Sequence, residues 1–95
     1  MKIRYNRSAA KQISEIYNYV AEDNRAAADR FVRRVERLAA LVADFPGIGR
    51  PADEPGVRVI GLRPFPYLMF YSVAENATEL HILQISHMAR QRRPT

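Results

Sequence analysis

The sequence contains no cysteine, which excludes a disulfide framework and a thiolate zinc site. It also has no charged-then-apolar leader and no apolar run as long as a membrane helix requires. We therefore expect neither export nor membrane insertion, and a reducing, cytoplasmic location. The two histidines, His81 and His87, would share one face of a strand but lie about 20 Å apart. We expect no metal site, because one ion cannot bridge that distance.

Motifs for nucleophilic catalysis and phosphate binding are also missing. Ser86 precedes His87 directly, so the two side chains would point to opposite faces of a strand. The pair Gly47-x-Gly49 leads into a loop, whereas a phosphate-binding loop leads into a helix. We therefore expect no bound cofactor.

A positive charge is present, since 15 Lys and Arg against 10 Asp and Glu give +5 and a pI near 10.1. Such a charge favours a polyanion or an acidic protein as partner, although many small proteins are basic without binding either. With 95 residues and 47% hydrophobic side chains, we expect one globular domain over residues 1–95.

Two amphipathic helices are predicted after a short strand at residues 2–5. Ser8 is the expected N-cap of the first helix, which ends near Glu22, and Asp23 or Asn24 is expected to cap the second. The second helix ends at Phe45, because the residue before a proline avoids the helical conformation. The apolar positions recur at steps of three and four and should face a sheet; they include Ile16, Tyr17, Phe31, Val35 and Leu38.

Beyond residue 56 the apolar period changes to two, which predicts strands at 57–62, 67–73 and 79–86. Residues 75–77 suit a hairpin turn, and the prolines in 63–66 should interrupt pairing. The expected fold class is α+β: an N-terminal strand, then an antiparallel helix hairpin packed on one face of a twisted antiparallel sheet that ends in a three-strand meander.

A metal-free ribonuclease would need a proton-transfer group and cations that stabilise the transition state. The candidates for such a site are His87, Arg58, Arg63 and Tyr71, with Arg90 and Tyr67 as further members. A structural alternative is that His87 caps the last strand and the arginines are solvated.

Two arginine clusters could bind a polyanion or simply be solvated. On the second helix, Asp29 is spaced to pair with Arg33, which favours a solvated helix face. The tail has Arg90, Arg92 and Arg93 without an acid, so these three are candidates for target binding.

Five blocks of the sequence, in this order, resemble the ParE/RelE toxin superfamily. They are A-A-x-x-I-x-x-I-Y-x-Y-V at 9–20, R-A-A-A-D-R-F-V-x-x-V-x-x-L-A-A-L at 25–41 with F-P-G-I-G-R-P after it, G-V-R-V-I at 56–60, F-P-Y-L-M-F-Y at 65–71 and I-L-Q-I-S-H-M-A-R-Q at 82–91. The resemblance implies a cytoplasmic toxin that an antitoxin neutralises by wrapping around it with an extended C-terminal segment.

Within that superfamily, the resemblance implies one of two activities. RelE-like members cut messenger RNA on the ribosome with a basic and aromatic cluster, whereas the characterised ParE-like members mostly inhibit DNA gyrase. This chain has no lysine after Lys11 and no tyrosine after Tyr71, which favours the ParE-like branch. A toxin homologue that serves only as a co-repressor with its antitoxin remains a third possibility.

An acidic antitoxin is the expected partner, in a heteromeric complex. Apolar residues alternate onto both faces of residues 80–85, more than one core requires, so we expect the antitoxin over the sheet edge or the helix hairpin.

Overall fold

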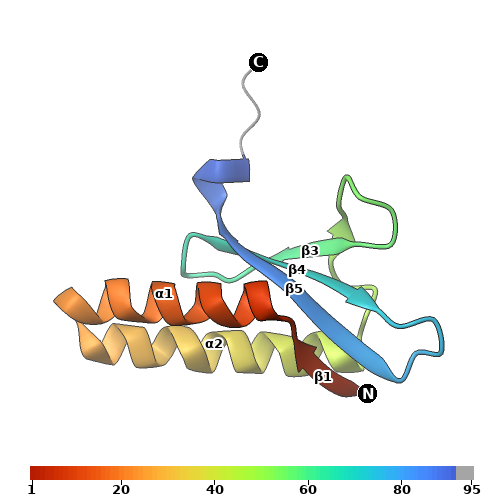
Figure 1. Cartoon of the computed structure of the whole chain (residues 1–95), viewed down its shortest axis with the longest axis horizontal. Helices are drawn as coiled ribbons and strands as arrows, with labels where there is room; N and C mark the ends of the chain where they lie inside the picture. The colour runs from red at the N-terminus through yellow and green to blue at the C-terminus, as the bar shows by residue number, and fades with distance from the viewer. Residues whose placement is uncertain (92–95) are drawn as a thin grey trace.

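The computed structural model describes residues 1–91. Two helices lie side by side on one face of a five-stranded sheet (Figure 1). In chain order the elements are β1 (Lys2–Tyr5), α1 (Arg7–Asp23), α2 (Arg25–Asp44), β2 (Arg50–Pro51), β3 (Arg58–Gly61), β4 (Tyr67–Val73), β5 (Glu79–His87) and the 3₁₀ turn η1 (Met88–Gln91). The expected α+β class is confirmed. No helix in the described part of the chain is long and apolar enough to span a membrane.

Asparagine caps both helices. The Asn6 side chain accepts a hydrogen bond from the Ala9 N–H at 2.9 Å, so the expectation that Ser8 caps α1 is wrong by two residues. Asn24 alone joins the helices: its N–H donates to the carbonyl of Val20, and its side chain accepts from Ala27. A one-residue connection holds α1 and α2 in a tight antiparallel hairpin.

The sheet is mixed, with the strand order β1-β5-β4-β3-β2. The expectation of an antiparallel sheet is wrong for β1, which lies parallel to β5 with Lys2 beside Glu79 and Tyr5 beside Ile82. The helix hairpin carries the chain away from β1 before the meander returns to it, so no tight turn constrains the direction of β1. The two-residue strand β2 was not expected, because two residues that include a proline show no strand periodicity.

An extra residue interrupts the pairing of β4 with β5. Phe70 lies opposite Gln84 but Tyr71 lies opposite Ile82, which leaves Leu83 without a partner position in β4. This β-bulge reverses the alternation of faces along β5. Consequently Leu80, Ile82 and Ile85 all belong to the core, and most of the apolar excess expected on the outer face is buried against the helices.

The same bulge separates the two histidines. His87 lies opposite Tyr67, whose ring touches Phe31 of α2, so His87 is on the helix side. His81 lies between the buried Leu80 and Ile82 and therefore faces the other side. The expectation that the histidines share a face is wrong.

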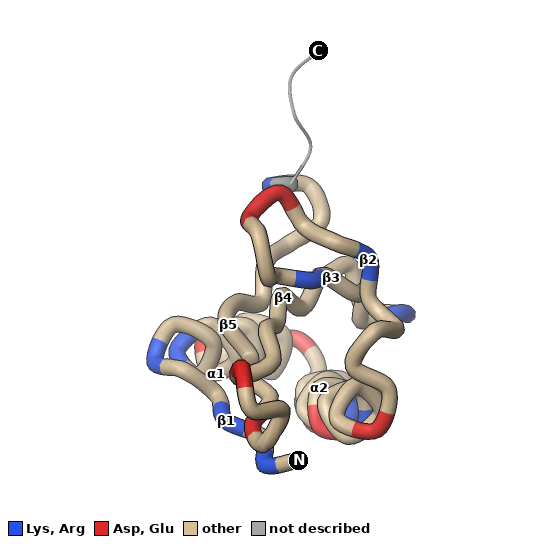
Figure 2. Tube along the Cα trace, turned by 90° about the vertical axis from the view of Figure 1, so that its right-hand side faces the viewer, with Lys and Arg blue, Asp and Glu red and all other residues tan. Residues whose placement is uncertain are grey.

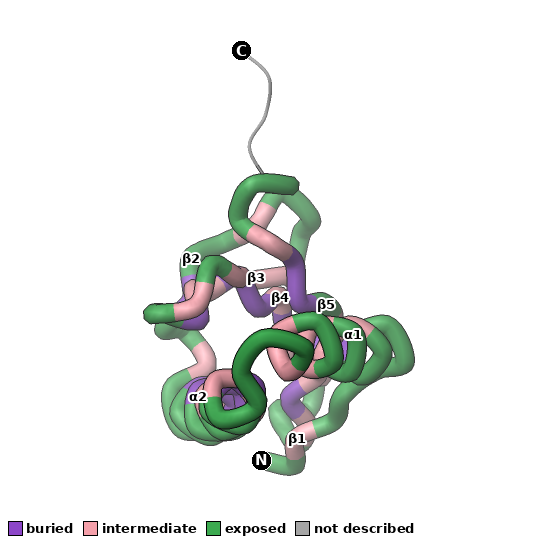
Figure 3. Tube along the Cα trace, turned by 90° about the vertical axis from the view of Figure 1, so that its left-hand side faces the viewer, coloured by how far each residue is buried: buried purple, intermediate pink, exposed green. Residues whose placement is uncertain are grey.

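The core lies between the helices and the central strands, where the buried residues gather (Figure 3). As expected, Phe31, Val35 and Leu38 are buried, and Ile16 packs against them. Tyr17 does not face the sheet; its hydroxyl donates to the carboxylate of Asp29 at 2.9 Å, across the seam between the helices.

Replacing Leu38 with alanine should lower the free energy of unfolding by about 2–5 kcal/mol, because the side chain is 2% exposed and its loss leaves a cavity. Leu41→Ala on the same helix removes the same atoms from a side chain that is 39% exposed, and should cost less than about 1 kcal/mol. Urea unfolding of both variants measures the difference. Equal losses would contradict this description of the core.

Candidate functional site

The four ribonuclease candidates do not converge. Arg58 lies opposite Tyr71 in one part of the sheet, whereas His87 lies opposite Tyr67 at the start of β4. Tyr67 and Tyr71 are four residue steps apart along β4, a distance of roughly 13 Å. Arg63 is in the β3–β4 loop, where its carbonyl accepts a hydrogen bond from Arg34.

Tyr71 and Arg58 hold the loop that follows α2. The Tyr71 hydroxyl, fully buried, donates to the carbonyl of Pro46 at 2.7 Å and accepts from the N–H of Gly49 at 2.9 Å. The Arg58 guanidinium donates to the carbonyl of Gly49 at 2.6 Å. A Cβ at residue 49 would lie 2.7 Å from that hydroxyl, so only glycine fits. We call this arrangement the loop clasp.

The His87 end is built differently. The Nδ1 atom of His87 accepts a hydrogen bond from the N–H of Ala89 at 3.0 Å, which requires Nδ1 to be unprotonated. The imidazole meets the Tyr67 ring edge to face, with centroids 5.2 Å apart. The N–H of Met88 donates to the carbonyl of Pro66, which ties the start of η1 to the β3–β4 loop. The structural role considered for His87, capping the last strand, fits these contacts.

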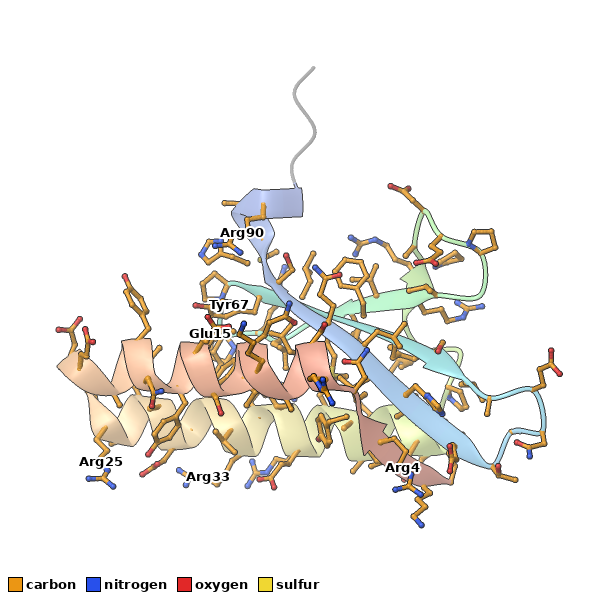
Figure 4. All side chains as sticks on the ribbon, in the orientation of Figure 1. Arg4, Glu15, Arg25, Arg33, Tyr67 and Arg90 are labelled. Atoms are coloured by element: carbon orange, nitrogen blue, oxygen red, sulfur yellow. The ribbon has the colours of Figure 1, made fainter. Side chains whose placement is uncertain are left out.

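A groove of about 780 Å³ opens between α1 and this end of β4 and β5. The side chain of Gln12 accepts the N–H of Ile85 at 2.7 Å, which links α1 to β5 along the groove. Glu15, Tyr67 and Arg90 lie near one another above α1 (Figure 4). The lining residues are Gln12, Glu15, Ile16, Tyr19, Val20, Pro66, Tyr67, Gln84, Ile85, Ser86, His87, Ala89 and Arg90. We call it the α1–β5 groove.

Tyr67 lines the groove, and its surroundings shift the pKa of its phenol. Burial raises the pKa of the Tyr67 phenol above its usual value, Tyr19 raises it further, and Arg90 opposes both. Tyr67 is therefore a neutral hydrogen-bonding group at physiological pH. The groove combines aromatic rings with one carboxylate, one guanidinium and the two amides of Gln12 and Gln84, a composition that suits binding of another chain.

Sequence reasoning found Tyr67, His87 and Arg90 but missed the α1 side of the groove. Tyr19 is 72% exposed and lies off the apolar stripe of α1, and a large aromatic off the stripe was the available signal. Two of the tail candidates for target binding, Arg92 and Arg93, lie outside the described residues. Within residues 1–91, no three His, Asp or Glu side chains lie close enough together to hold a metal ion.

Removing the Tyr71 hydroxyl with Tyr71→Phe should lower the free energy of unfolding by about 1–3 kcal/mol, because Gly49 and Pro46 each lose a buried partner. The control Tyr19→Phe removes a hydroxyl from an exposed ring and should change stability by less than about 0.5 kcal/mol. Chemical denaturation of both proteins gives the comparison. If Tyr71→Phe unfolds like the wild type, the loop clasp does not stabilise the fold.

Comparison with known proteins agrees with this fold. In a solved structure described as the chromosomal ParDE TA system from P. aeruginosa, one chain is 28% identical, with a TM-score of 0.77 over 92% of this chain and 95% of that one. A YoeB/ParE toxin from Agrobacterium tumefaciens (17% identity, TM-score 0.65, 92% and 98% covered) and a chain of the intact E. coli RelBE toxin-antitoxin complex (14%, 0.63, 90% and 94%) share the fold.

Sequence comparison gives the family. The Sinorhizobium fredii (strain NBRC 101917 / NGR234) protein named "Putative toxin Y4kP" is 29% identical over 90 residues, which cover 95% of this chain and 91% of that protein. The model of the family described as ParE toxin of type II toxin-antitoxin system, parDE, matches residues 3–92. The chain therefore belongs to the ParE toxin family of type II toxin–antitoxin systems.

Proposed function

We propose that this toxin acts in the cytoplasm by binding its target rather than by cleaving RNA. In this proposal the target is DNA gyrase, and an acidic antitoxin neutralises the toxin. The observation that supports binding over RNA cleavage is that the ribonuclease candidates lie at two separate places in the sheet. A general base and a phosphate clamp must reach the same scissile phosphate. Here the hydroxyl proton of Tyr71 is already donated to Pro46, and His87 lies roughly 13 Å from Tyr71 along the strand direction.

The hydrogen bond that Arg58 makes supports the same proposal. Its guanidinium donates through Nη1 to the carbonyl of Gly49 within the loop clasp, which holds the side chain at the loop after α2, in the part of the sheet away from His87. A phosphate clamp that acts together with His87 would have to lie near Tyr67 instead.

The α1–β5 groove is the proposed docking site for the antitoxin. The P. aeruginosa and E. coli structures are described as toxin–antitoxin systems, and we extend that partnership to this chain. A partner segment with an apolar side would cover Ile16 and Tyr67, and an acidic group on it would meet Arg90. The overall charge of +5 would accelerate its association.

Gyrase inhibition is tested with a supercoiling assay on the purified 95-residue protein and primer extension on messenger RNA from expressing cells. We expect inhibited supercoiling and no codon-phased cuts. Cuts at codon positions with normal supercoiling would overturn the proposal in favour of the RelE-like activity. If both assays are negative while the antitoxin binds tightly, the co-repressor function replaces it.

The docking site is tested with Tyr19→Arg, which places a bulky charge at the rim of the groove. Antitoxin affinity should fall by roughly 10–100-fold, because a tyrosine that anchors an interface contributes about 1–3 kcal/mol. The matched control is Ile48→Arg, since Ile48 is also exposed but lies in the loop after α2, outside the groove. Calorimetric titration with the product of the adjacent reading frame compares the two. Equal affinities would place the antitoxin elsewhere.

A further inference from the structure

β5 continues beyond the point where its neighbouring strand ends. β1 pairs with β5 as far as Ile82, whose carbonyl accepts the N–H of Asn6 as the chain turns into α1. Viewed end-on, β5, β4, β3 and β2 follow one another, with β1 and α1 both beside β5 (Figure 2). Within residues 1–91, no strand pairs with the β1 side of β5 between Ile82 and its end at His87. We call residues 83–87 on that side the open β5 edge.

A side chain takes the place of a strand at this edge. The Gln12 side chain of α1 accepts the N–H of Ile85 at 2.7 Å, a bond that a neighbouring strand would otherwise make. Backbone groups alternate between the two sides of a strand, so those of His87 point to the same side as those of Ile85. Those of Ser86 point to β4, where Leu68 lies opposite. The open β5 edge therefore presents main-chain donors and acceptors at the spacing that strand pairing requires.

The α1–β5 groove runs along this edge and not over one face of the sheet. Its lining includes four consecutive residues of β5, Gln84, Ile85, Ser86 and His87. Successive side chains of a strand point to opposite faces, so a groove that contacts all four lies at the edge of the strand. A chain bound in the groove therefore lies beside β5, where a further strand would be added.

We propose that the partner in the α1–β5 groove is an extended segment that pairs with the open β5 edge through its main chain and displaces the side chain of Gln12. The inference rests on the proposed function, since the partner is the antitoxin named there. Strand addition of this kind gains affinity from main-chain hydrogen bonds and specificity from pockets for alternate side chains. In the free toxin, Gln12 occupies the N–H that the partner would use.

The composition of the groove favours a strand over a helix. The backbone groups of a helix bond within the helix, so a bound helix would leave the open β5 edge unused. A strand beside β5 would send alternate side chains to the two faces of the sheet. On the helix side they would meet Ile16 and Tyr67, and on the other side Gln84, which suits a segment that alternates apolar with polar residues. An acidic residue at the end nearest η1 would meet Arg90.

The same features protect the free toxin from unwanted pairing. Proteins commonly protect an open sheet edge with a bulge or by covering it. β5 has its bulge at Leu83, and the Gln12 side chain covers the N–H of Ile85. A partner that brings a carbonyl to this N–H exchanges one hydrogen bond for another, so displacing Gln12 costs little free energy.

The displacement is tested with Gln12→Ala and the control Asn18→Ala, which removes an exposed amide of α1 outside the groove. Calorimetric titration of the 95-residue protein uses the product of the adjacent reading frame as the probe. Gln12→Ala should raise the affinity roughly 2–10-fold, because the partner no longer has to break the bond to Ile85. Asn18→Ala should leave the affinity within about twofold of wild type. An unchanged or lower affinity of Gln12→Ala would overturn the displacement of Gln12.

The pairing itself is measured by NMR on the complex of isotope-labelled toxin with the same probe. We expect main-chain NOEs between the probe and residues 83–87, together with slower exchange of the His87 amide. A helical probe with side-chain NOEs alone would overturn strand pairing and leave the proposed docking site intact. Absence of any NOE to the groove, with Tyr19→Arg binding as tightly as wild type, would overturn the docking site and the pairing together.

Discussion

The extra residue at Leu83 determines which face of the sheet each part of β5 presents. Before the bulge, Leu80 and Ile82 face the helices; after it, Ile85 and His87 lie on that same side, although regular alternation would turn them outward. A strand without the bulge would bury Gln84 and expose Ile85. The bulge thus keeps a nine-residue strand in register with both the core and the groove.

The two positions on β4 that this register defines have different physical characters. Around Tyr71, the tyrosine hydroxyl and the Arg58 guanidinium make hydrogen bonds within the fold that hold the backbone of the loop after α2. Around Tyr67, rings meet edge to face and the helix hairpin extends past the sheet, which leaves Tyr19 uncovered. Satisfied hydrogen bonds stabilise a fold, whereas partly covered aromatic groups gain free energy when a partner covers them. Function is therefore more readily assigned to the second position.

Local pattern predicted most of the architecture. The helices follow from apolar steps of three and four, the end of α2 from Pro46, and β4 from its alternation and aromatic content. The parallel pairing of β1 could not be predicted, because it depends on contacts between residues nearly 80 positions apart. The bulge could not be predicted either, because it depends on how β5 fits against β4. The cap at Asn6 was missed because Ser8 satisfies the same local rule. Only the backbone conformation distinguishes them.

The candidate site shows the same division between local and long-range information. Residue type identified Tyr71, Arg58 and His87 as candidates for catalysis. In the structure, however, Tyr71 and Arg58 form the loop clasp. A side chain can react only where its donors and acceptors are not already bonded within the fold. The sequence alone does not show which donors are already bonded. The same division is seen on α2, where spacing alone pairs Asp29 with Arg33, whereas in the structure Asp29 accepts the hydroxyl of Tyr17 from the neighbouring helix.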